Sequence, residues 1–175
     1  MQNLEAKFKL ADLGQARIRA EAIGFVFSSV LIQRDTFFAV PHGKLKLREE
    51  GGGAALIHYQ RGIAHGFELS NYTIAKLTDA VSARTILESA LGVIAEVRKR
   101  RTLLLRENIR LHLDEVEGLG EFGEIEVVLQ TNHHLDAGHA ALREILETLE
   151  IQTRDRIEVS YFELTRGNRA DRPAP

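Results

Sequence analysis

NLEAK, which spans residues 3–7, alternates polar and apolar side chains close to the start of the chain. Successive side chains of a β-strand point to opposite faces, so Asn3, Glu5 and Lys7 would share one face of a strand here. A strand with one face in water gives this pattern. A carboxylate and an ammonium that both face a ligand give it too. The neighbouring strands must decide between these interpretations.

The same alternation recurs in later segments, where charged residues share one strand face and aliphatic residues take the other. The ionisable residues placed in this way are Lys44, Lys46 and Arg48; Lys99 and Arg101; Arg110, His112 and Asp114; and Glu124 and Glu126, while Arg61 ends the segment LIHYQR. A sheet with one wet face alternates by itself, but such a face usually mixes in uncharged polar residues. Here cationic and anionic residues are grouped on separate strands. This grouping favours an enclosed site in which cations meet phosphates and carboxylates hold a metal.

The balance of these charges predicts the sign of a ligand. If the sheet closes on itself, each buried ion costs several kcal/mol unless it is paired or liganded. The candidate cations are Lys7, Lys44, Lys46, Arg48, Arg61, Lys99 and Arg101, and the candidate carboxylates are Glu5, Asp114, Glu124 and Glu126. The cations exceed the carboxylates, so the sequence predicts a polyanionic ligand.

The hydrophobic patterns predict about eight strands and three helices. The expected strands span residues 3–7, 30–40, 43–50, 54–61, 66–76, 93–105, 108–116 and 123–130, and the expected helices span 10–25, 78–91 and 135–151. Residues 156–165 read as a last strand or a short irregular segment. Because tight turns join most strands, we expect a largely antiparallel sheet, curled or closed, with helices outside it, in the α+β class.

Composition excludes several classes of protein. The chain has 175 residues, a formal net charge of -2 and no cysteine, which excludes thiolate metal sites and disulfides. The basic run at residues 98–101 would be split between two strand faces, so we expect no nucleic-acid partner. No apolar run is long enough to span a membrane, and we expect a cytoplasmic protein without a membrane partner. A single domain is predicted over residues 1–165, followed by a disordered tail at 166–175.

Together these segments resemble the CYTH superfamily, which includes class IV adenylyl cyclases and thiamine triphosphatases and is also called the triphosphate tunnel metalloenzymes. The resemblance rests on NLEAK, QRDTFF followed by GKLKLRE, LIHYQR, VRKRR and LDEVEGLGEFGEIE, in that order, and runs from residue 3 to about 165. QRDTFF and GKLKLRE most resemble the class IV adenylyl cyclase-like branch. The resemblance implies a closed eight-stranded antiparallel β-barrel with a polar interior and helices packed outside.

The resemblance also implies roles for individual residues. Mg²⁺ or Mn²⁺ would be held by Glu5, Glu124 and Glu126, with Asp114 close by or at a second metal, and Glu5, Lys7 and Glu126 would be catalytic. The residues expected to grip phosphates are Lys7, Lys44, Lys46, Arg48, Arg61, Lys99 and Arg101. A homodimer is implied by analogy with the cyclase branch alone.

One departure from the family pattern bears on activity. The first glutamate of the motif is Asn3 here, and an amide brings no charge to a metal. The sequence therefore leaves three functions open: a cyclase that converts ATP to cyclic AMP and pyrophosphate, a triphosphatase acting on tripolyphosphate, thiamine triphosphate or a nucleoside triphosphate, and a non-catalytic polyphosphate or nucleotide binder.

Overall fold

Nine strands and four α-helices make up the computed structural model, which describes residues 2–64, 67–129 and 135–170. The strands are β1 (Gln2–Lys9), β2 (Val26–Phe38), β3 (Lys44–Glu50), β4 (Gly53–Ala64), β5 (Phe67–Leu77), β6 (Val93–Arg106), β7 (Ile109–Val116), β8 (Gly120–Leu129) and β9 (Arg156–Ile157). The helices are α1 (Leu13–Ala22), α2 (Ala80–Leu91), α3 (Leu135–Thr148) and α4 (Tyr161–Ala170), with a 3-10 turn at Thr153–Asp155. No helix in the described ranges is long and apolar enough to cross a membrane.

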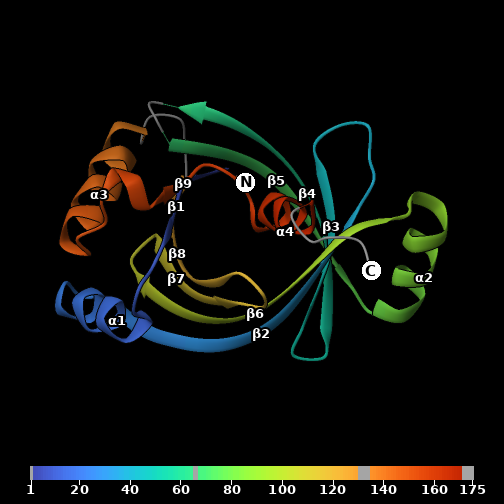
Figure 1. The fold of residues 1–175 in the computed structure, drawn as a ribbon, viewed down its shortest axis with the longest axis horizontal. Coiled ribbons are helices and arrows are strands. Elements are labelled where there is room, and N and C mark those ends of the chain that lie inside the picture. The colour runs from blue at the N-terminus through green and yellow to red at the C-terminus, as the bar shows by residue number, and fades with distance from the viewer. Residues whose placement is uncertain (1, 65–66, 130–134, 171–175) are drawn as a thin grey trace.

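Eight of the strands close into a barrel. The sheet runs β5-β4-β3-β2-β6-β7-β8-β1-β9, and a further pairing of β5 with β1 closes the ring (Figure 1). Every pairing is antiparallel. β5 pairs with the first half of β1, from Gln2 to Glu5, whereas the short β9 pairs with Lys7 and Phe8. The predicted closed antiparallel barrel in the α+β class is confirmed.

α1 and α3 lie on the same side of the barrel, against β1, β7 and β8 (Figure 1). The apolar residues of the alternating strands point outward here, so Leu4, Phe8 and Ile125 are buried beneath the helices rather than inside the barrel. Asp12 precedes α1, and its Oδ1 accepts a hydrogen bond from the Gln15 backbone N–H at 3.0 Å. With its aliphatic face buried outside, the barrel leaves its charged face for the interior.

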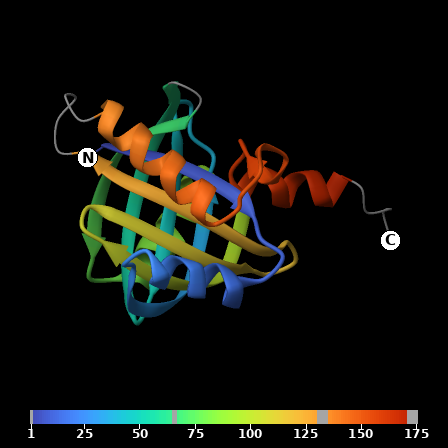
Figure 2. The same cartoon turned by 90° about the vertical axis from the view of Figure 1, so that its left-hand side faces the viewer.

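α4 is a helix that the sequence analysis did not predict. It follows β9 and projects away from the barrel (Figure 2). Its first two side chains pack on residues of the barrel interior: the Phe162 ring stacks on Phe37 with centroids 5.1 Å apart, and Tyr161 lies 5.1 Å from Phe122. The predicted domain boundary at residue 165 falls inside α4, and residues 171–175 lie outside the described ranges.

The two ends of the barrel therefore differ. At the α4 end, the carboxyl end of β2 and the amino end of β6 contribute Phe37 and Val97 to an apolar cluster with Tyr161 and Phe162. Toward the opposite end the cavity extends to Leu31 on β2, Ile74 on β5 and Leu105 on β6, and the side chains of Ile74 and Leu105 are exposed at the surface.

Candidate active site

The charged residues of β1, β7 and β8 meet on the inner wall of the barrel. Strand register places Glu5 opposite Glu126 and Lys7 opposite Glu124, and on the next strand His112 opposite Glu124. All five line a cavity of about 500 Å³. That volume lies within the range of about 300–1,000 Å³ that is typical of small-molecule sites.

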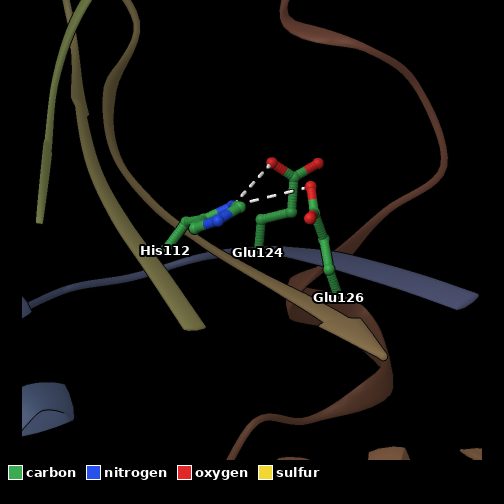
Figure 3. A group of neighbouring side chains, drawn as sticks. All are labelled: His112, Glu124 and Glu126. Atoms are coloured by element: carbon green, nitrogen blue, oxygen red, sulfur yellow. Dashed lines mark ion pairs between the residues drawn. The ribbon is translucent and has the colours of Figure 1, made fainter. Parts of the chain in front are cut away.

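His112, Glu124 and Glu126 form a group of possible metal ligands. The His112 ring on β7 points toward two carboxylates on β8, with Nδ1 lying 3.5 Å from Glu124 Oε2 and 3.7 Å from Glu126 Oε1 (Figure 3). One ligand atom from each residue lies within 4.8 Å of the other two. His112 and Glu124 are buried and Glu126 is partly buried, so the group faces the cavity rather than bulk water.

This group fits a divalent cation. Carboxylate oxygens suit Mg²⁺ and Mn²⁺, and an imidazole nitrogen suits Mn²⁺ better than Mg²⁺. Among the described residues, His112 Nδ1 is buried and accepts or donates no hydrogen bond. A buried nitrogen without a partner is costly, and coordination of an ion would satisfy it. The cluster could therefore hold one cation with three protein ligand atoms.

Glu5 and Asn3 border the same cluster from β1. Burial, together with repulsion from Glu124 and Glu126, raises the pKa of Glu5 to about 7, although Arg61 lies 3.7 Å away. A bound cation would reverse this balance, because a nearby positive charge favours the ionised carboxylate. Asn3 accepts a hydrogen bond from the Tyr72 hydroxyl at 3.3 Å and donates one to Glu126 at 3.4 Å. In this arrangement Asn3 orients Glu126.

Two carboxylates hold most of the cavity's cations in place. Asp35 on β2 accepts hydrogen bonds from Lys46 at 2.9 Å and from the Arg48 guanidinium at 2.7 and 2.8 Å. Glu124 accepts from Lys7 and from Arg101, both at 2.8 Å. Burial acts to raise the pKa of both carboxyls, but the neighbouring cations hold each pKa well below its usual value. Both carboxylates are therefore ionised at neutral pH.

Burial and neighbouring positive charges disfavour the protonated form of two lysines in the cavity. Burial and the nearby Arg101 lower the pKa of Lys99 to about 7, and burial and Arg48 lower the pKa of Lys46 to about 8. A polyanion beside these lysines would favour their charged forms. The part of the cavity around Lys46 and Lys99 is thus electrostatically unfavourable for more cations and favourable for a multiply charged anion.

Of the predicted site residues, Asp114 and Lys44 lie outside the group of possible metal ligands and the cavity lining, whereas Arg61 lines the cavity. Asp114 is fully buried and accepts two hydrogen bonds from Arg101, at 2.7 and 2.6 Å, and one from the Tyr161 hydroxyl at 3.0 Å. The structure does not bring Asp114 into the His112–Glu124–Glu126 group. Asp114 holds Arg101 instead. Lys44 lies at the α4 end, 3.0 Å from Glu163, and does not line the cavity. Arg61 does line it, between Glu5 and Glu68.

Sequence reasoning missed His112, Asp35 and Arg110 as site residues. His112 and Arg110 stand in the alternating run with Asp114, which was a signal that they face inward, whereas nothing in QRDTFF singles out Asp35. With these residues included, the described part of the chain lines the cavity with seven lysines and arginines and five aspartates and glutamates: Lys7, Lys46, Arg48, Arg61, Lys99, Arg101 and Arg110, against Glu5, Asp35, Glu50, Glu124 and Glu126. The cationic excess is smaller than predicted but keeps its sign.

A closed antiparallel barrel with a cationic interior and a carboxylate-rich group of possible metal ligands is the architecture of a triphosphate-tunnel protein. The chain matches the CYTH domain over residues 1–161 and belongs to that family. It is 27% identical over 173 residues to the Methanocaldococcus jannaschii protein named "Putative adenylate cyclase MJ0240", covering 94% of this chain and 98% of that one.

Solved structures show the same fold. The PH1012 protein of Pyrococcus horikoshii superposes with a TM-score of 0.82 and 22% identity, covering 93% of this chain and 98% of that chain. The HpAC1 protein of Hippeastrum, whose structure is described as revealing a dominant triphosphatase activity, has a TM-score of 0.67 and 16% identity, covering 96% of each chain.

Proposed function

We propose that this protein is a divalent-metal-dependent enzyme that acts on a triphosphate held in the barrel cavity, most similar to class IV adenylyl cyclases. One observation carries the proposal: the His112–Glu124–Glu126 cluster and seven cationic side chains line a single cavity. A site for a metal alone would not need the cations, and a site for a simple anion would not need the cluster.

The chain's own residues bind and orient the phosphate chain. Lys7 and Arg101 are fixed by Glu124, and Lys46 and Arg48 by Asp35, so they present charge without reorganising when the ligand enters. Arginine guanidinium groups suit bidentate contacts with phosphate oxygens. A divalent cation on His112, Glu124 and Glu126 would neutralise phosphate charge and polarise the reacting phosphoryl group.

Cyclase and triphosphatase reactions differ in which oxygen attacks which phosphorus. In a cyclase the ribose 3′ hydroxyl attacks the α-phosphorus and pyrophosphate leaves; in a triphosphatase water attacks the terminal phosphorus and orthophosphate leaves. The name of the Methanocaldococcus relative favours the first, and the activity described for the Hippeastrum protein favours the second. We place the cyclase first because of the whole-length sequence match and hold triphosphate hydrolysis as the second candidate.

Phosphorus NMR of the products tests the proposal. Purified protein is incubated with Mg²⁺ or Mn²⁺ and with ATP, tripolyphosphate or thiamine triphosphate in separate tubes. We expect cyclic AMP with pyrophosphate from ATP, or orthophosphate if the second candidate holds, and no product when EDTA replaces the metal.

Glu126→Gln should abolish turnover while leaving the fold intact, because it removes a metal-ligating charge from a partly buried site. Glu115→Gln is the matched control: Glu115 lies on β7, faces outward and pairs with the exposed Arg100. Turnover that survives in Glu126→Gln, or in EDTA, would contradict the metal assignment. Binding of all three compounds without any product would make the protein a non-catalytic triphosphate binder.

A further inference from the structure

The start of α4 supplies part of the cavity wall. Within the described ranges, the residues that line the cavity lie on the eight barrel strands, except Ser160 and Tyr161. Tyr161 is the first residue of α4 and is 6% exposed. Phe162, its neighbour in the chain, is buried as well but packs on Phe37 and does not line the cavity. Of the two aromatic residues at the start of α4, only Tyr161 therefore faces the cavity.

Tyr161 lies beside cations from two strands. Its ring centroid is 4.9 Å from Lys7 Nζ on β1 and 5.2 Å from Lys99 Nζ on β6. Its hydroxyl donates a hydrogen bond to Asp114 Oδ2 at 3.0 Å, and the same oxygen accepts one from Arg101 at 2.6 Å. The ring thus contacts two of the cavity's cations directly, and the hydroxyl reaches a third through a carboxylate.

A neutral ring can hold an ammonium group in place without neutralising it. The face of an aromatic ring attracts a cation within about 6 Å of its centroid, and does so more strongly where water is excluded. Burial and the nearby Asp114 carboxylate hold the pKa of Tyr161 well above its usual value, so the ring carries no charge at neutral pH. A carboxylate in the same place would instead offset the charge that attracts a phosphate.

Lys99 is the cation that depends most on this ring. Its Nζ lies 3.9 Å from an oxygen of Asp35 and 3.9 Å from one of Asp114, and both distances are longer than a hydrogen bond. Lys7, in contrast, also donates a hydrogen bond to Glu124 at 2.8 Å. Without the ring, the long Lys99 side chain could adopt other rotamers, and ordering it again on a ligand would cost affinity.

We infer that Tyr161 is a positioning residue for the reaction: its ring holds Lys7 and Lys99 in place for the phosphates at the α4 end of the cavity. Through Asp114 its hydroxyl holds Arg101 there as well. This inference rests on the proposed function. The phosphate-binding wall is then complete only with a residue from outside the strands, so α4 belongs to the active site and does not merely cover the end of the barrel.

Three variants separate this role from the packing of α4. Tyr161→Leu removes the ring and the hydroxyl, Tyr161→Phe keeps the ring, and Phe162→Leu disturbs the packing of α4 at a residue that does not line the cavity. Calorimetric titration with tripolyphosphate in EDTA tests the cations alone. We expect Tyr161→Leu to weaken binding about tenfold, because two lysines lose their preorganisation. Tyr161→Phe should stay within about threefold of the wild type, and Phe162→Leu should bind like the wild type.

The other outcomes keep this inference apart from the proposed function. Equal weakening in Tyr161→Leu and Phe162→Leu, or no weakening in Tyr161→Leu, would overturn the positioning role. Turnover of ATP or tripolyphosphate by the wild-type protein with Mn²⁺ would still support the proposed function in that case. Wild-type protein that binds tripolyphosphate without turning over any triphosphate would overturn the proposed function, and the positioning role with it.

A measurement on the wild-type protein decides the matter if Tyr161→Leu does not fold. In protein with ¹³C-labelled lysine, the NMR signal of the Lys99 Hε protons is identified by its loss in Lys99→Arg. We expect this signal upfield of that of an exposed lysine such as Lys76, because Lys99 lies over the face of the Tyr161 ring. We also expect it to shift when tripolyphosphate is added. A Lys99 signal at the position of exposed lysines, or one that tripolyphosphate leaves unchanged, would contradict the inference.

Discussion

Asp35 is 2% exposed and is surrounded by positive charge, with Lys46 and Arg48 in hydrogen-bond contact and Lys99 at 3.9 Å. Removing one partner of a buried ion pair leaves the other uncompensated, which costs about 3–5 kcal/mol. We therefore expect Asp35→Asn to lower the free energy of unfolding by about that amount. Urea denaturation measures it, in buffer without phosphate so that no anion replaces the carboxylate.

Glu49→Gln is the control for this change. Glu49 on β3 pairs with Arg84 near the surface, where loss of an ion pair costs about 1 kcal/mol or less. An Asp35→Asn protein as stable as Glu49→Gln would show that Asp35 does not hold the cationic wall together.

Lys99 makes triphosphate binding depend on pH. In the free protein its pKa is lowered to about 7, and a bound polyanion raises that pKa again. Below pH 7 Lys99 is already charged and contributes fully. Above pH 7 binding requires uptake of a proton, so affinity falls as pH rises until the pKa of the complex is reached.

The matched variant is Lys99→Arg, because arginine stays charged throughout this range. The tripolyphosphate dissociation constant of the wild-type protein, divided by that of Lys99→Arg, should rise about tenfold or more between pH 6.5 and 9. Protonation of the ligand cancels in this ratio. A ratio that stays constant would show that Lys99 does not take up a proton on binding.

At the scale of single residues, sequence alternation predicted which side chains face inward but not which ones meet. Glu5, Lys7, Glu124 and Glu126 were placed by alternation and by family resemblance. The approach of His112 to Glu124 depends on the register between β7 and β8, which alternation alone does not fix.

At the scale of strands, β1 and β8 approach each other closely where Phe8 pairs with Gly123. A Cβ atom added to Gly123 would overlap the Phe8 ring, with Cε2 and Cζ the nearest atoms. Phe8 is fully buried beneath the helices, so it has no room to move aside. Gly123→Ala should destabilise the protein by about 1–3 kcal/mol through overpacking.

Thermal or urea unfolding measures this cost, and Gly62→Ala is the control, because no described atom lies within 4 Å of a Cβ added there. Phe8→Leu should recover part of the loss when combined with Gly123→Ala. Strictly additive effects in this double-mutant cycle would contradict a clash between the two residues.

The segment after β9 shows where pattern reading failed at this scale. Residues 156–165 were predicted to form a last strand or a short irregular segment; β9 accounts for Arg156–Ile157, but a helix begins at Tyr161. Tyr161 and Phe162 are adjacent, however, and both are buried against the barrel interior. Their contacts with Phe122 and Phe37, residues far away in the chain, favour the helix, and no local pattern reports such contacts.

At the scale of the whole molecule, the barrel separates an aliphatic outer layer from a charged interior, and its two ends differ. Aliphatic strand faces pack outward under α1 and α3, charged faces line the interior, and the two ends differ because α4 covers one of them. The closed fold was predictable, since charged faces recurred on strand after strand and resembled one family. The difference between the two ends of the barrel was not predictable from the sequence, because it depends on α4 and on how far each strand extends past its neighbours.

The central claim is that a divalent cation on His112, Glu124 and Glu126 contacts a triphosphate held by the cationic wall. Its most direct test is a crystal structure with Mn²⁺ and a non-hydrolysable ATP analogue, with anomalous scattering used to locate the manganese. The account predicts an anomalous peak between His112 and the two carboxylates, within bonding distance of a phosphate oxygen, with the phosphates beside Lys46, Arg48 and Arg101. Manganese absent from this cluster, with the analogue bound elsewhere on the protein, would contradict it.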